Sequence, residues 1–231
     1  MNTATPLQLA TWTSTGVSNA AGPQFMFDRG TVPNRLAGVS VVLETGGLPR
    51  ARMRLEAGAS QVLLGDAALH QLALVRAAVE EFGRARTGIW VPARRAPVSW
   101  SLDAYSNCDF KCMVPSNPQA RWDVLRADRL QAGLDVRRWV EKLLAQGVST
   151  VLVGVDIQDD RDLDVCAGLV EEFGPALWFS PLDQPAADFA SWVEYGQVRR
   201  LVLPQGPGRA ALSRSLLEKF GPAAVAGGVA A

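Results

Sequence analysis

From about Val39 onward, short apolar runs rich in β-branched residues alternate with longer segments of helical periodicity. Such alternation is typical of repeated strand–helix units, and it constrains the fold more than any other feature of the chain. Runs that are apolar on both faces suit a parallel sheet that is covered by helices. The six runs lie at residues 39–43, 61–64, 98–102, 150–155, 176–179 and 200–203.

Glycine residues mark the ends of four expected helices. A glycine just past a helix adopts positive φ without a steric penalty, and it is a common way to end the helix. The four helices are expected at residues 49–57, 69–82, 135–146 and 162–173, and two shorter ones at 186–194 and 209–220.

The first 38 residues depart from this alternation of strands and helices. Residues 7–12 and 24–27 read as strands, but the segments that follow them are short and rich in Gly, Pro, Ser and Asn. We therefore predict a single α/β domain over residues 1–231, a (β/α)8 TIM barrel with one or two N-terminal helices missing or reduced. The long connection at residues 107–131 is expected on the functional face of the barrel.

Charge and cysteine content exclude several classes of function. The 23 Lys and Arg residues balance 23 Asp and Glu residues, so the chain lacks the basic surface of a nucleic-acid-binding protein. It has no apolar stretch of about 18 residues and no signal-like start, which predicts a cytoplasmic protein without a membrane partner. Three cysteines and one histidine, His70, do not form a disulfide scaffold or a zinc motif. We expect no metal and no cofactor.

Two motifs near the third and fourth expected strands carry a family resemblance. Residues 41–50 read Val-Val-Leu-Glu-Thr-Gly-Gly-Leu-Pro-Arg, and residues 55–68 read Leu-Glu-Ala-Gly-Ala-Ser-Gln-Val-Leu-Leu-Gly-Asp-Ala-Ala. With Ser101-Leu102-Asp103-Ala104, they resemble the histidine-biosynthesis barrels, which include a ribotide isomerase and the cyclase subunit of imidazole glycerol phosphate synthase. The likeness covers about residues 39–160 and implies a barrel of the ribulose-phosphate-binding type.

The resemblance implies a phosphate site and a general acid. Gly46 and Gly47, with Gly65 and Asp66, fall where the family holds one substrate phosphate through backbone N–H groups. Asp103 falls on the aspartate after the fifth strand that the family uses as a general acid. Near the end of the chain, Gly208-Arg209-Ala210 resembles the family's Gly-Arg-Ala at strand eight, and the resemblance implies phosphate binding by Gly208 and Arg209.

Each of these residues also has a simpler structural explanation. Gly46 and Gly47 could only form the tight turn before a helix that Pro49 begins. Asp103 could cap a helix or pair with a nearby arginine. Asp156 follows the sixth strand and could form a carboxylate pair with Asp103, or it could belong to the helix start that follows.

Three further residues are candidates for contacts with a substrate. Arg50 could screen an anion at the glycine pair, and Trp122 could stack on a flat ring. Asp183 follows the seventh strand, as Asp156 follows the sixth. Cys108, Lys111 and Cys112 lie in the long connection; a mobile, solvated lysine is the simpler interpretation of Lys111, and no histidine stands near the thiols.

Departures from the family leave two functions open. Residues 7–12 hold no aspartate to act as a base, Val155 stands at a threonine position, and residues 180–183 replace a glycine pair. One hypothesis is an isomerase- or lyase-like enzyme that acts on a small phosphorylated metabolite but does not carry out the family's reaction. The other is a degenerate, non-catalytic barrel that binds a ligand or a partner protein. Missing N-terminal helices would expose apolar surface on that side, which predicts a homodimer there.

Overall fold

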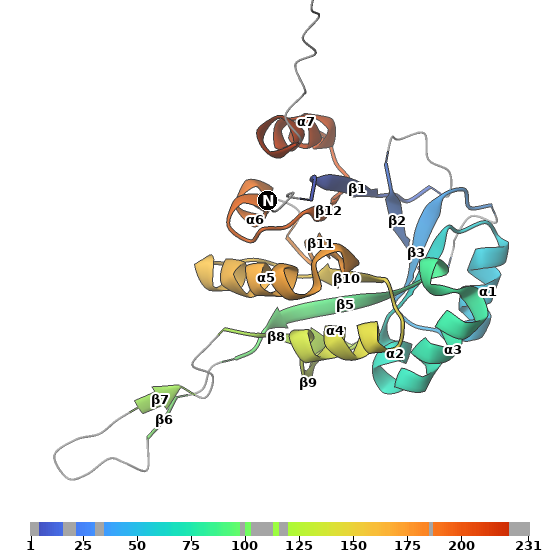
Figure 1. The fold of residues 1–231 in the computed structure, drawn as a ribbon, viewed down its shortest axis with the longest axis horizontal. Coiled ribbons are helices and arrows are strands. Elements are labelled where there is room, and N and C mark those ends of the chain that lie inside the picture. The colour runs from blue at the N-terminus through green and yellow to red at the C-terminus, as the bar shows by residue number, and fades with distance from the viewer. Residues whose placement is uncertain are drawn as a thin grey trace, which may run out of the picture.

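Eight parallel strands close into a barrel with the helices arranged around it (Figure 1). The computed structural model describes residues 5–15, 22–30, 35–97, 100–102, 113–115, 120–184 and 187–221. In order around the barrel, the strands are β1 (Gln8–Trp12), β2 (Gln24–Phe27), β3 (Val39–Leu43), β4 (Gln61–Leu64), β5 (Thr87–Arg95), β10 (Thr150–Gly154), β11 (Leu177–Ser180) and β12 (Arg200–Leu203). Pairing of β12 with β1 closes the barrel. The predicted (β/α)8 fold is confirmed.

The helices follow the strands much as the glycine pattern predicts. They are α1 (Leu48–Glu56), α2 (Asp66–His70), α3 (Leu72–Phe82), α4 (Val136–Ala145), α5 (Asp160–Phe173), α6 (Phe189–Glu194) and α7 (Arg209–Phe220). Short 3-10 turns, η1 (Arg84–Arg86) and η2 (Gly174–Ala176), precede β5 and β11. The helix expected at 69–82 begins earlier and is divided in two, because Gln71 has extended backbone angles. None of the helices in the described ranges has the length and apolar character needed to cross a membrane.

A ring of apolar side chains fills the barrel interior, and each strand contributes one of them. Alternation along each strand sends every second side chain inward and the next one toward the helices. The interior ring consists of Ala10, Phe25, Val42, Leu63, Trp90, Leu152, Trp178 and Val202. The outward residues form a second, larger core with the helices. The runs that are apolar on both faces are explained by this double burial.

Gly154 makes room for the Trp90 ring inside the barrel. A Cβ atom at this position would lie 2.1 Å from Cη2 of Trp90 and 2.8 Å from its Cζ2. Trp90 is almost fully buried, so its rigid ring has little space into which it could move. The glycine that ends β10 is therefore required by the Trp90 side chain of the neighbouring strand β5.

We expect Gly154→Ala to lower the free energy of unfolding by about 1–3 kcal/mol, because the added methyl group overpacks the interior against Trp90. Urea unfolding followed by tryptophan fluorescence measures the change. Gly168→Ala is the matched control: Gly168 lies within α5 and nothing stands within 4 Å of the added Cβ. That control should stabilise the protein slightly, since alanine is the better helix former. Equal stabilities of the two variants would contradict the packing described for Trp90.

The described residues between β1 and β3 contain no helix, as the sequence predicts, yet several apolar side chains in the first 38 residues are buried. Leu7, Met26 and Leu36 are each about 5% exposed or less. The segment around Leu36 lies against the end of α1, where the Leu36 N–H donates to the Ala57 carbonyl. The large apolar side chains that are exposed in the described ranges are Met53, Leu130, Tyr195 and Leu217, and none of them lies in the described part of residues 5–38. The homodimer expected on this side stays a prediction.

The placement of the fifth barrel strand at residues 98–102 was wrong. The fifth strand is β5, which continues beyond the barrel and pairs antiparallel with β8 (Trp122–Leu125), which in turn pairs with β9 (Gln131–Asp135). Residues 100–102 form β6 (Trp100–Leu102), which pairs with β7 (Met113–Pro115) in a separate hairpin that projects from the barrel (Figure 1). Asp103 thus follows a hairpin strand instead of a barrel strand, and it lies outside the described residues.

Candidate functional site

A cavity of about 560 Å³ opens at the carboxyl ends of the barrel strands. Residues at or just after the ends of every barrel strand except β10 line it, and this is the face that carries active sites in barrels of this type. The turn at residues 126–130, between β8 and β9, supplies Arg126, Ala127 and Arg129 to the cavity wall. The expectation that part of the long connection lies on this face is confirmed for Ala127 and its neighbours.

Aromatic rings form the floor of the cavity. Trp12 stacks on Phe27 with 4.3 Å between ring centroids, and Trp90 meets both rings edge to face. Phe25 and Trp178 continue this packing beneath them. Trp12 is held in place because its indole N–H donates to Ser180 Oγ at 3.0 Å, and Ser180 donates in turn to the Pro181 carbonyl. The floor is therefore apolar and rigid.

Three arginines stand around this floor. Arg29 lies over the Phe27 ring at 5.7 Å and has no ion pair within the described part of the chain. Arg126 pairs with Asp128, but its Nε–H is buried and has no hydrogen-bond acceptor among the described residues. Arg129 lies 3.5 Å from Asp183 and has a positive φ of 66°, which is costly for a residue other than glycine. The rim is thus rich in cationic donors, some of which lack a strong partner.

Most carboxylates around the mouth hold other groups in place. Asp66 lines the cavity, accepts the Ala127 N–H at 2.9 Å and pairs with His70 at 3.1 Å. Asp183 also lines the cavity and pairs with Arg94 and Arg129. Asp66 and Asp183 are the two predicted site residues that the structure brings together in this cavity.

Asp156 performs a structural task after β10. Its carboxylate accepts backbone N–H groups of Leu182, Asp183 and Gln184 at 3.0–3.1 Å, which fixes the loop after β11. The N-cap of α5 is Asp159, which accepts the Arg161 and Asp162 N–H groups. A carboxylate pair of Asp156 with Asp103 stays a prediction, because Asp103 lies outside the described residues.

The glycines predicted to bind phosphate serve the backbone in other ways. The Gly65 and Asp66 N–H groups already donate to the Leu43 and Glu44 carbonyls at 2.9 and 3.0 Å. A Cβ at Gly65 would lie 2.8 Å from the Glu44 carbonyl oxygen, so this glycine is required by close backbone packing. Gly46 turns the chain with φ of 106°, and Gly47 is the N-cap of α1. The alternative interpretation of this motif as a tight turn therefore has structural support.

Gly208 and Arg209 begin α7, with Gly208 in the left-handed conformation. Neither residue lines the cavity, although Pro204 and Gln205 just before them do.

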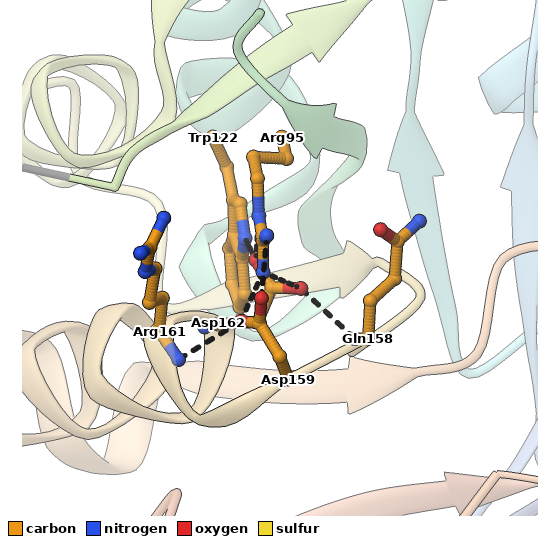
Figure 2. A network of polar contacts seen from close by, with 6 residues as sticks. All are labelled: Arg95, Trp122, Gln158, Asp159, Arg161 and Asp162. Atoms are coloured by element: carbon orange, nitrogen blue, oxygen red, sulfur yellow. Dashed lines mark hydrogen bonds and ion pairs between the residues drawn. The ribbon is translucent and has the colours of Figure 1, made fainter. Parts of the chain in front are cut away.

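Arg50 and Trp122 are committed to contacts outside the cavity. Arg50 donates to both carboxylate oxygens of the buried Asp28, at 2.7 and 2.8 Å. Trp122 is 1% exposed, and its indole N–H donates to Asp162 at 2.9 Å in a network with Arg95 (Figure 2). Burial leaves no face of the Trp122 ring for a substrate. These two substrate-contact predictions disagree with the observed contacts.

The remaining candidates lie elsewhere. Cys108, Lys111 and Cys112 are outside the described residues. Cys166 is buried, and burial, together with the nearby Asp162, raises the pKa of its thiol well above the usual range, so it is unreactive. No cluster of three or more His, Cys, Asp or Glu side chains in the described ranges has the arrangement of a metal site.

Sequence reasoning missed the cavity residues that lie on the first three strands and on the turn. Strand alternation, combined with the barrel prediction, would have placed three of them on the inward side: Trp12, Phe27 and Glu44 each lie two residues after an interior side chain. Arg126 and Arg129 carried no signal, because their place depends on how β8 and β9 return to the barrel. No protein-family model matches the chain, and a search of curated proteins finds no significant relative.

Proposed function

We propose that the protein is a barrel enzyme that binds a small phosphorylated metabolite in the cavity at the carboxyl ends of its strands. The observation that carries the proposal is the convergence of Arg29, Arg126 and Arg129 around an aromatic floor. Guanidinium groups donate to phosphate oxygens in a bidentate manner, and the floor would carry the apolar or planar part of the ligand.

Two details of the rim support an anionic ligand. The Arg126 side chain stays 39% exposed at the rim although it pairs with Asp128, so its guanidinium can still donate to a phosphate oxygen. Arg129 occupies a left-handed position where glycine would be less strained, and strained residues of this kind cluster at functional sites. The phosphate would therefore be held mainly by arginine side chains, and not by the amides of Gly65 and Asp66.

A non-catalytic ligand-binding barrel is the second candidate. It is favoured by the commitment of Asp66, Asp156 and Asp183 to intramolecular partners, which leaves few groups at the rim for proton transfer. Both candidates place the ligand in the same cavity, and turnover separates them.

A thermal-shift screen of sugar phosphates and ribotides tests the proposed site. A phosphorylated ligand at about one hundred times its Kd stabilises a protein by about 2.7 kcal/mol, which for this chain length raises Tm by about 5–10 °C. Arg29→Ala should abolish most of this shift. Arg76→Ala is the control, because Arg76 lies exposed on α3 and pairs with Glu80 away from the cavity. A screen without any stabilising phosphate compound, or a shift that Arg29→Ala leaves intact, would overturn the proposal.

A further inference from the structure

Glu44 holds a position that differs from that of every other carboxylate around the cavity. It follows β3 directly, and it lies two residues after Val42, whose side chain belongs to the barrel interior. Strand alternation therefore sends the Glu44 side chain toward the mouth, and the residue lines the cavity and is half-buried. Its backbone carbonyl accepts the Asp66 N–H, which fixes the main chain at this point.

The Glu44 carboxylate is uncommitted. Within the described ranges its oxygens make no hydrogen bond and no ion pair, whereas Asp66, Asp156 and Asp183 all hold partners. A carboxylate that already binds an arginine or several N–H groups must give up those contacts before it takes a proton. The charged groups that share the cavity with Glu44 are Arg29, Asp66, Arg126, Arg129 and Asp183.

We infer that Glu44 is the proton-transferring residue of the cavity. Its substrate would be a small molecule whose acidic C–H belongs to a planar unsaturated group lying on the floor of Trp12, Phe27 and Trp90. A carboxylate beside an apolar, partly desolvated floor is a typical general base for such a proton. The inference rests on the proposed function for the location of the active site, but it does not need the phosphate.

5-Nitrobenzisoxazole tests this base directly, because it is flat, carries no phosphate and reports proton abstraction. The Glu44 carboxylate takes the hydrogen of the isoxazole carbon as a proton, and the electrons of that C–H bond complete a nitrile. The ring N–O bond breaks at the same time, and the oxygen leaves as a coloured phenolate. Solvent then removes the proton from Glu44, so no oxidant, reductant or second substrate is required.

We expect saturable conversion by the wild-type protein and a loss of about 100-fold or more in kcat/KM in Glu44→Gln. Glu44→Asp keeps the carboxylate and should retain part of the activity. Glu56→Gln is the control, since Glu56 ends α1 at an exposed position outside the cavity.

Glu44→Gln removes no described side-chain contact, so its Tm should stay close to that of the wild type. As a second measurement, carbodiimide coupling of glycinamide to Glu44, located by peptide mass, should progress in parallel with the loss of activity. Conversion by the wild type no faster than by Glu44→Gln, or a Glu56→Gln variant equally impaired, would overturn the inference. Either result would leave the phosphate-dependent thermal shift unaffected, so failure of the two proposals can be told apart.

Discussion

Replacing Asp162 with alanine should lower the free energy of unfolding by about 2–4 kcal/mol, because it removes a buried acceptor that the partly exposed Arg95, the buried Trp122 indole N–H and the Gln158 N–H share. Asp162 is 1% exposed and accepts the Trp122 indole N–H and the Gln158 amide, both at 2.9 Å. Asp162 also forms an ion pair with Arg95, whose Nη2 lies 2.6 Å from the carboxylate Oδ2 (Figure 2). All of these donors would lose a buried partner together.

Asp164→Ala is the control for this change. It makes the same replacement on the same helix, at an exposed position whose carboxylate has no partner among the described residues. The control should alter the free energy of unfolding by less than about 0.5 kcal/mol. Urea unfolding followed by far-ultraviolet circular dichroism compares the variants. A loss below about 1 kcal/mol in Asp162→Ala would mean that the network adds little stability.

The network matters for the cavity because it anchors the strands that carry the 126–130 turn. Arg95 and Trp122 are neighbours across the β5–β8 ladder, and α5 supplies Asp162 beneath them. Hydrogen bonding to Asp159 raises the pKa of Arg95 above its usual range, in spite of burial, and Arg95 in turn lowers the pKa of Asp159 to about 2. The contacts therefore persist over the range of pH in which the site would work.

The barrel could be predicted from the sequence because its strands carry a signal on both faces. β3 and β4 are buried at every position, and such runs are apolar without interruption or nearly so. The helix ends were also predictable, since Gly58 and Gly83 adopt positive φ where the sequence placed stops. Long-range packing was not needed to recognise these elements.

The fifth strand, β5, was not recognised from the sequence because packing inside the barrel interrupts its apolar pattern. Gly88 and Pro92 interrupt the apolar run of β5, because both face inward on either side of the large Trp90 ring. At Gly88, an added Cβ would lie 3.0 Å from Leu63 and 3.1 Å from the Thr150 carbonyl. Residues 98–102 looked more like a strand than β5 did, and residues 100–102 do form one, but in the projecting hairpin.

The site was less predictable than the fold because motif residues and cavity residues are largely different. The glycine motif at residues 46–47 and 65 shapes the backbone, while Glu44 beside it lines the cavity. Which residues surround a barrel mouth depends on the stagger of the strands, and that cannot be read from a local pattern. Asp66 and Asp183 were found because each lies within three residues of the end of a barrel strand.

Asp28→Ala is expected to cost about 3–5 kcal/mol of stability, since Asp28 connects the end of β2 to α1 and the described residues between β2 and β3 form no helix. Its side chain is fully buried and accepts hydrogen bonds from Arg50 and from Arg54, one helical turn apart on α1, and from the Gly30 N–H. Without Asp28, two arginines would face each other across a largely buried site. Urea unfolding at neutral pH measures the loss, and Asp160→Ala, at an exposed position in the first turn of α5, is the control.

The same carboxylate predicts how stability responds to acid. Burial alone would raise the pKa of Asp28, but the hydrogen bonds from Arg50 and Arg54 outweigh it and hold the pKa well below the usual range. An unfolded aspartate has a pKa of about 3.9, so the stabilisation is complete above that value and is lost as pH falls below about 4. The stability difference between wild type and Asp28→Asn should therefore be constant from about pH 7 to pH 5 and shrink toward pH 3. A difference that stays constant to the lowest pH at which both proteins fold would show that the ionised form of Asp28 is not what the arginines stabilise.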